Sequence, residues 1–241
     1  IILMGSERIH LFDTPLLMSR NMGLAVDQRV AKRIMDILVS GIGIVITSPI
    51  MLLIAIAVKA YDRGPVFYFQ DRLTIGGKPF KICKFRSMCV DSEKNGARLA
   101  SKHDSRITPV GHVLRNLHLD ELPQLFNVFK GDMSLVGPRP ERKTIMQEYE
   151  KELPEFYYRL KVKAGLTGYA QVYGKYNTTP YDKLKLDLFY IENYSFLLDV
   201  KLIFMTVKIF FQKEVSEGVD DKQVNARKDS GRITGASEDK M

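Results

Sequence analysis

The feature that most constrains this chain is a long run without a charged residue. It extends from Ile37 to Val58. At about 1.5 Å per residue in a helix, the run can cross a hydrocarbon layer roughly 30 Å thick. No small-residue cleavage pattern follows it, which argues against a signal peptide. A buried core helix stays an alternative, although few soluble helices are apolar on every side over such a length.

A proline interrupts the run and predicts a bend. Pro49 lacks a backbone donor and clashes with the carbonyl of Val45, so we expect a helix kinked at Ser48–Pro49. The Ser48 hydroxyl can satisfy a carbonyl that the kink releases. Positively charged residues flank the run on both sides, at Lys32, Arg33, Lys59 and Arg63. Because such residues mark the cytoplasmic side of a membrane segment, this symmetry favours a re-entrant helix over a straight span.

The rest of the chain predicts an α+β fold that is predominantly helical. Two alternating, aromatic-rich runs within residues 64–88 flank Gly76 and Gly77 and predict a β-hairpin. Helices are expected over residues 121–131, 141–160, 180–194 and 199–212. The last of them carries Lys201 and Lys208 on an apolar surface. This suits either an amphipathic helix in the membrane interface or a core helix with two solvated lysines.

These expectations divide the chain into four segments. They are a connector (1–26), the re-entrant membrane helix (27–60), a cytoplasmic domain (61–212) and a disordered polar tail (213–241). The chain starts with Ile1, so we expect it to be the C-terminal part of a longer protein. Its net charge of +8 favours an anionic partner, either nucleic acid, a phospholipid surface or a phosphorylated substrate. Cys83 and Cys89 lack the spacing of a metal or redox pair and are expected to be free thiols.

Two adjacent carboxylates, Asp120 and Glu121, stand out in this basic chain. If a helix starts near Asp120, Pro123 falls in its first turn, where a proline costs no needed donor. A helix cap explains one acid, and the positive helix end would keep it ionised. Neighbouring residues do not face each other as the acids of a glycosidase do. They suit a division of labour in which one carboxylate attacks phosphorus and the other holds Mg²⁺.

Cationic residues accompany the acid pair. Lys84 and Arg86 are two apart on a predicted strand, so both are expected to project from one face. Arg139 is held between two prolines, which lowers the entropy of presenting its guanidinium to a phosphate. The predicted phosphate-binding set is Lys84, Arg86, Arg115, Arg139 and Arg142. Each alone is more often a solvated surface charge, but together with the acids they indicate a phosphate-handling site beside a membrane.

Three stretches carry a resemblance to a known family. They are KFRSM (84–88), LHLDELPQLFNVFKGDMSLVGPRP (117–140) and GLTGYAQV (165–172). Together with the membrane segment broken by Ser-Pro, they resemble the bacterial sugar transferases, which are monotopic polyprenyl-phosphate phosphoglycosyl transferases. The similarity extends over about residues 32–212.

The resemblance implies an activity and a set of roles. The family transfers a sugar-1-phosphate from a UDP-sugar to undecaprenyl phosphate at the cytoplasmic face of the inner membrane, releasing UMP and using Mg²⁺ or Mn²⁺. This step initiates exopolysaccharide, capsule, O-antigen or glycoprotein glycan synthesis. By resemblance, Asp120 is the nucleophile that carries the phosphosugar, Glu121 binds the metal with it, and the role of Asp187 stays open. The implied partners are both substrates and membrane lipid, without nucleic acid, and a homo-oligomer stays open.

Some residues depart from the family pattern or invite other roles. Ala164 replaces a usual proline, and Gly174–Lys175 replaces Gly-Arg, so a bidentate contact is lost there. Structural roles are expected for His103, His112 and His118, and packing roles for Tyr173, Tyr176 and Tyr181. The rival function is a non-catalytic, membrane-attached basic module that binds anionic lipid or nucleic acid. It gives no reason for the acid pair.

Overall fold

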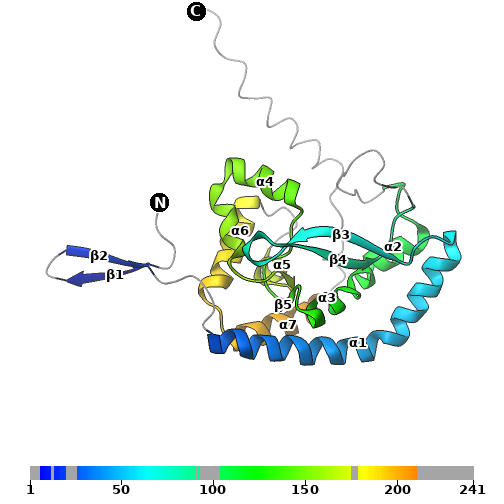
Figure 1. Cartoon of the computed structure of the whole chain (residues 1–241), viewed down its shortest axis with the longest axis horizontal. Coiled ribbons are helices and arrows are strands. Elements are labelled where there is room, and N and C mark those ends of the chain that lie inside the picture. Colours follow the sequence, from blue (N-terminus) through cyan, green and yellow to red (C-terminus); the bar gives the residue numbers. More distant parts are fainter. Residues whose placement is uncertain are drawn as a thin grey trace, which may run out of the picture.

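The computed structural model describes residues 6–11, 14–19, 26–90, 92, 104–174 and 179–210. Helices dominate this part of the chain (Figure 1). The α-helices are α1 (Val26–Asp62), α2 (Pro109–Asn116), α3 (Gln124–Lys130), α4 (Lys143–Glu152), α5 (Tyr169–Tyr173), α6 (Pro180–Glu192) and α7 (Phe196–Phe210). Three 3₁₀ helices are η1 (Ile75–Gly77), η2 (Leu119–Glu121) and η3 (Pro154–Lys161). The strands are β1 (Ser6–Leu11), β2 (Thr14–Ser19), β3 (Phe67–Leu73), β4 (Pro79–Phe85), β5 (Ser134–Val136) and β6 (Gly165–Thr167).

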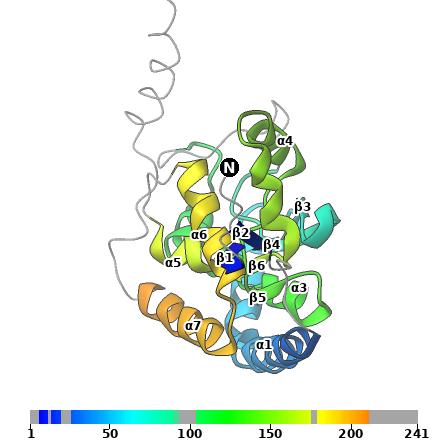
Figure 2. The same cartoon turned by 90° about the vertical axis from the view of Figure 1, so that its left-hand side faces the viewer.

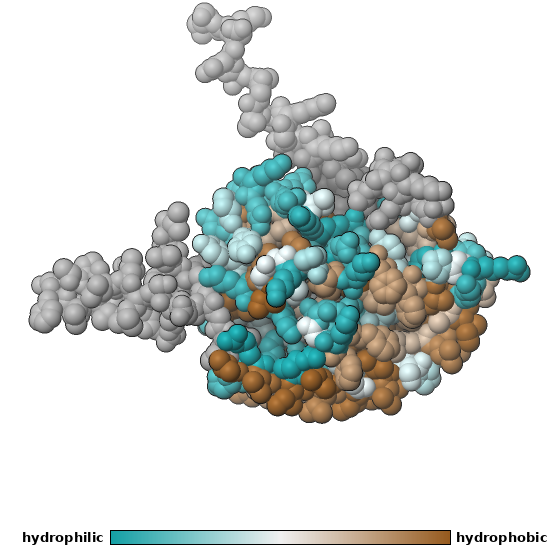
Figure 3. Space-filling view, in the orientation of Figure 1, coloured by the Kyte–Doolittle hydropathy of each residue, from teal (hydrophilic) through white to brown (hydrophobic). Residues whose placement is uncertain are grey.

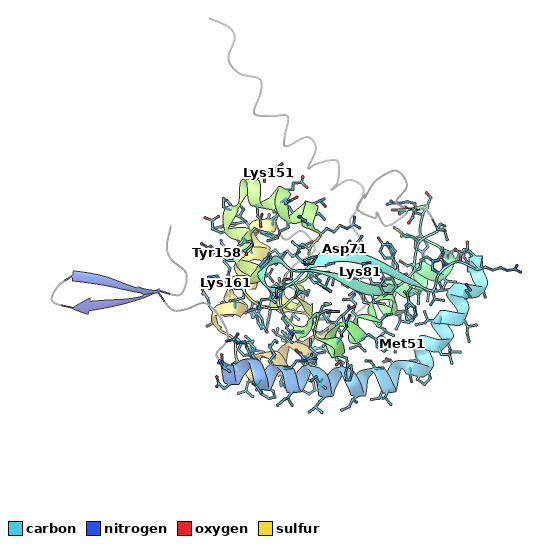
Figure 4. All side chains as sticks on the ribbon, viewed as in Figure 1. Met51, Asp71, Lys81, Lys151, Tyr158 and Lys161 are labelled. Atoms are coloured by element: carbon cyan, nitrogen blue, oxygen red, sulfur yellow. The ribbon has the colours of Figure 1, made fainter. Side chains whose placement is uncertain are left out.

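Helix α1 lies along one edge of the fold (Figure 1). It is long and apolar enough to cross a membrane, and only 17% of its apolar window is buried in the described structure. The alternative of a buried core helix is therefore wrong. The Ser48 hydroxyl donates to the carbonyl of Val45 at 2.8 Å, as predicted for a proline-interrupted helix. The ribbon changes direction near Met51 (Figure 4), and the surface along this edge is hydrophobic (Figure 3).

The first half of α1 is attached to the body through buried polar groups. Lys32 donates to Asp199 of α7 at 2.5 Å and to the hydroxyl of Tyr190 of α6 at 3.1 Å. Asp36 accepts from the backbone N–H of Leu135 in β5 at 2.9 Å. Helix α7 accordingly lies beside α1 in both views (Figures 1 and 2). Many of the other apolar residues of α1, among them Ile42, Val45 and Leu53, stay exposed.

The predicted hairpin is confirmed. β3 and β4 pair in antiparallel register, with Asp71 opposite Lys81 (Figure 4). The connection is the 3₁₀ turn η1, in which Gly76 and Gly77 have φ values of +66° and +73°. Residues other than glycine rarely adopt such φ values, which explains the Gly-Gly pair.

Several elements differ from expectation. The single helix expected over 141–160 is divided into α4 and η3 at Pro154, which lacks the N–H that a continuing helix needs. The expected connector contains the β1–β2 hairpin, and β5 and β6 form a short parallel pair that was not predicted. Helices α6 and α7 confirm the last two predicted helices. The predicted disordered tail lies outside the described residues.

Two hydrophobic clusters support the region between α1 and the hairpin. The larger one contains Val128 of α3, Phe156 of η3 and Leu202 of α7, all fully buried. The smaller one packs Met51 of α1 against Phe85 of β4. The acid pair lies in η2, which precedes α3 in the chain and contacts β4, so the two clusters fix the elements around it.

Candidate active site

A sharp turn places the acid pair. After α2 ends, His118 adopts a left-handed conformation (φ 52°), which cannot continue a helix, and the chain turns into η2. Asp120 and Glu121 both belong to η2, and α3 begins only at Gln124, after Pro123. Asp120 is 9% exposed and the Glu121 side chain 17%. Both carboxylates are therefore largely removed from water.

Two of the predicted cations converge on Glu121. Lys84 of β4 donates to its Oε1 at 2.6 Å, and Nη2 of Arg139 donates to the same oxygen at 2.5 Å. Nη1 of Arg139 reaches Oε2 at 3.4 Å. Burial alone would raise the pKa of Glu121, but the charges of Arg139 and Lys84 outweigh it and hold the pKa well below its usual range. Glu121 is therefore an ionised carboxylate at neutral pH.

Asp120 has the opposite environment. No described residue forms a hydrogen bond or an ion pair with its carboxylate. Burial raises the pKa of Asp120, the Lys84 and Arg115 cations oppose this only in part, and the neighbouring Glu121 adds to it. Asp120 does not lie at the start of α3, as expected, but in the three-residue turn η2 ahead of it. A carboxylate made more basic in this way is a better nucleophile once ionised.

The loop that presents Arg139 is fixed through its carbonyl groups. Residues 138–141 each accept one hydrogen bond, in order from the backbone of Gly165, from Arg159, from Arg72 and from the backbone of Leu73. These bonds are 2.9–3.1 Å long. The Arg139 side chain keeps 41% of its surface exposed, so a fixed backbone carries an accessible guanidinium.

Arg86, predicted to bind phosphate, is placed elsewhere. Both of its terminal nitrogens donate to the carboxylate of Asp62 at the end of α1, and its side chain is 8% exposed. Lys84 and Arg86 therefore have different carboxylate partners, Glu121 and Asp62. Arg86 joins the hairpin to α1.

The remaining predicted residues have other surroundings. Arg115 donates to Ser87 at 2.9 Å and still acts electrostatically on Asp120. Arg142 is the N-cap residue of α4. Tyr173 packs against Tyr169, with ring centroids 4.4 Å apart, as expected of a packing residue. His112 lies within α2 and Tyr181 within α6, whereas His103, Lys175 and Tyr176 fall outside the described residues.

Asp187 and a residue that the sequence did not single out form a buried ion pair. Asp187 lies in α6 and is 1% exposed; Nη2 of Arg159 approaches it at 2.7 Å from η3. Arg159, which is 2% exposed, also donates to the Arg139 carbonyl at 3.0 Å. No local sequence pattern marks Arg159, since it lies in an ordinary amphipathic stretch.

The acid pair is suited to a hard divalent cation. Among the described residues, no group of three or more His, Cys, Asp or Glu side chains could hold a metal by itself. Oε1 of Glu121 is shared by two cations, whereas Oε2 has only the 3.4 Å contact and Asp120 has no partner in the described structure. These oxygens fit Mg²⁺, which binds through one or two carboxylates and takes its other ligands from phosphates and water.

A long apolar helix beside buried acids and convergent cations is the arrangement expected of a membrane-associated, phosphate-handling protein. The family model described as bacterial sugar transferase matches residues 27–213, and the chain belongs to that family. It is 38% identical over 189 residues to a UDP-glucose:undecaprenyl-phosphate glucose-1-phosphate transferase of Caulobacter vibrioides, covering 76% of this chain and 70% of the relative.

Two longer relatives are more similar. A UDP-N-acetylgalactosamine-undecaprenyl-phosphate N-acetylgalactosaminephosphotransferase of Aeromonas hydrophila is 47% identical over 180 residues, 73% of this chain. A UDP-glucose:undecaprenyl-phosphate glucose-1-phosphate transferase of Klebsiella pneumoniae is 44% identical over 208 residues, 84% of this chain. The matched part is 43% of the length of each of these two relatives. Because the sugars in the names of these relatives differ, the names do not identify one sugar for this chain.

Proposed function

We propose that this chain transfers a sugar-1-phosphate from a UDP-sugar to undecaprenyl phosphate and releases UMP. One observation carries the proposal. The buried charged residues of the described structure are Lys32, Asp36, Arg86, Asp120, Arg159, Asp187 and Asp199. All except Asp120 have a hydrogen-bonding or ionic partner there. A largely buried carboxylate without a protein partner is costly to ionise, and such groups cluster at functional sites. The rival basic binding module does not explain this exception.

The proposed reaction has two displacements at one phosphorus atom. A carboxylate oxygen of Asp120 attacks the phosphorus bound to the sugar, the P–O bond to UMP breaks, and UMP leaves with the electron pair. The acyl phosphate on Asp120 is then attacked by a phosphate oxygen of undecaprenyl phosphate, which frees the carboxylate. Lys84, Arg115 and Arg139 neutralise the phosphate oxygens, because positioned cations stabilise the charge that develops there.

Mg²⁺, or Mn²⁺ in its place, is the proposed cofactor. When bound, the ion would neutralise the donor diphosphate and help UMP to leave. Glu121 would hold it through Oε2, with Asp120 beside it, while Lys84 and Arg139 keep Glu121 ionised. The two cations also keep the Glu121 side chain in one orientation.

Mass spectrometry and product assays test the covalent step together. The purified chain in lipid nanodiscs is incubated with a panel of UDP-sugars and Mg²⁺, first without and then with undecaprenyl phosphate. We expect a sugar-phosphate adduct on Asp120, with no more than one equivalent of UMP, in the first case and continued UMP release in the second. Asp120→Asn removes both, whereas Asp71→Asn, at an exposed position of β3, retains both. Turnover that survives Asp120→Asn contradicts the covalent route.

We also propose that α1 is a re-entrant membrane helix at the cytoplasmic face of the inner membrane. Its exposed apolar residues, Pro49 and the flanking cations support this topology. Helix α7, with Lys201 and Lys208 exposed beside Phe204, would lie in the interface. Val30→Cys and Tyr61→Cys, introduced singly at exposed positions after Cys83 and Cys89 are replaced, should be labelled from the same side. Labelling from opposite sides would establish a straight span.

In this proposal the glycan pathway follows from the acceptor. A sugar phosphate loaded on undecaprenyl phosphate initiates a glycan that is later exported, such as an exopolysaccharide, a capsule, an O-antigen or a glycoprotein glycan. The sugar that the UDP-sugar panel transfers then indicates which of these pathways the chain can start.

A further inference from the structure

The buried pair of Arg159 and Asp187 contacts the loop that carries Arg139 from inside the fold. Nε and Nη2 of Arg159 contact the same carboxylate oxygen of Asp187, at 3.1 and 2.7 Å. Nη2 also donates to the Arg139 carbonyl at 3.0 Å. The ring of Phe156 lies 4.7 Å from the guanidinium carbon, which restricts the plane of the fork.

The pair need not add stability beyond what a hydrophobic contact would give at the same place. Both side chains are almost completely removed from water, and a buried ion pair is often no more stabilising than apolar residues of similar volume. Stability alone therefore does not require Arg159. What an apolar residue cannot do is donate to the Arg139 carbonyl, which accepts from Arg159.

An arginine is required because two acceptors must be met at once. Asp187 and the Arg139 carbonyl lie on the donor side of one planar guanidinium, and Nη1 also approaches Glu141 at 3.5 Å. A lysine at this position can pair with Asp187 but lacks the fork that reaches the carbonyl as well. Arg159→Lys should therefore keep the ion pair with Asp187 but lose the hydrogen bond that supports the loop.

We propose that Arg159 is a positioning residue for Arg139, with Asp187 holding its guanidinium in place. Arg159 touches no substrate: it fixes the backbone from which Arg139 reaches Glu121 and the donor phosphates. This inference rests on the proposed function and assigns Asp187, whose role the family resemblance left open, to the support of the phosphate-binding loop.

A double-mutant cycle on the full chain in nanodiscs tests the proposal. Arg159→Lys and Asp187→Asn are each introduced into the wild type and into Arg139→Lys, and kcat/KM is measured by UMP release. In the wild type we expect each change to lower kcat/KM about tenfold to a hundredfold, the range for losing a hydrogen bond to a charged group. In Arg139→Lys the same changes should cost less than about threefold, because their effect passes through Arg139.

Asp199→Asn provides the matched control. Asp199 is 0% exposed and pairs with Lys32, so its loss disturbs an equally buried ion pair on α7. It should lower thermal stability as Asp187→Asn does, without the dependence on Arg139. Equilibrium binding of UDP serves as a second measurement for variants with too little turnover, and Arg159→Lys should weaken it in the wild type more than in Arg139→Lys.

Equal losses in both backgrounds would overturn the proposal and leave the pair a structural support only. If the wild-type chain forms the adduct and releases UMP, and Arg159→Lys does so equally well, the proposal is overturned as well. The proposed function then still stands. A wild type that releases no UMP with any UDP-sugar would instead refute the proposed function, and this inference with it.

Discussion

Asp120 and Glu121 are adjacent in the sequence, yet neutralising Glu121 should destabilise the fold whereas neutralising Asp120 should not. Glu121→Gln removes the charge that holds Lys84 and Arg139. Two hydrogen bonds to charged groups are worth about 1.5–3 kcal/mol each. Arg139 is 41% exposed, so solvent screening reduces its share. We therefore expect a loss of about 2–4 kcal/mol, which for a chain of this length lowers Tm by about 5–15 °C.

Asp120→Asn should leave Tm unchanged or raise it, because the carboxylate has no partner in the described structure and its burial disfavours the charge. Both variants should lose UMP release. Since the chain contains no Trp, unfolding in detergent is best followed by far-ultraviolet circular dichroism. A Tm for Asp120→Asn that falls as far as that of Glu121→Gln would refute the distinction between a structural and a reactive carboxylate.

The stability of the fold should also depend on pH in opposite ways through the two carboxylates. The pKa of Glu121 is lowered in the folded state, so its stabilising contribution is complete above about pH 4.5 and is lost as the pH falls below that value. The pKa of Asp120 is raised, so its ionised form destabilises the fold at neutral pH, and this penalty disappears below about pH 4. In acid, both variants should therefore approach the Tm of the wild type. Glu121→Gln approaches it from a lower Tm and Asp120→Asn from an equal or higher one.

Three further predictions concern the surroundings of the acid pair. Chelation of divalent cations should abolish adduct formation, and Mg²⁺ or Mn²⁺ should restore it; adduct formed in excess chelator would contradict the metal requirement. Arg86→Lys should lower Tm by about 2–6 °C through the weakened pair with Asp62, with KM for the donor within about twofold, as measured by UMP release. Asp199→Asn should cost about 3–5 kcal/mol by leaving Lys32 buried without its partner, whereas a Tm equal to that of the wild type would show that the pair is not stabilising.

The parts of the fold that follow from local rules were predictable from the sequence. The long apolar helix, the Gly-Gly hairpin and the last two helices each depend on a continuous pattern of residues. Pro154 shows the opposite case, since apolar spacing on either side of it suggested one helix and a single missing N–H divided it in two. The short β5–β6 pair was missed because its three-residue strands are too brief to display alternation and pair across a long sequence separation.

The candidate site shows the same limit at the level of single residues. Asp120, Glu121 and Arg139 could be singled out because the adjacent acids and the flanking prolines are visible in the sequence itself. The ion pair of Arg86 with Asp62 could not be predicted, since the two residues are 24 positions apart and meet only through the packing of β4 against α1. Arg159 could not be found at all, because its partners are 20 and 28 positions away. If the positioning role is right, sequence motifs reveal the groups that react, whereas the residues that hold them are determined by packing between distant elements. Substitutions that weaken activity without touching the motif should then cluster around the carbonyls of residues 138–141.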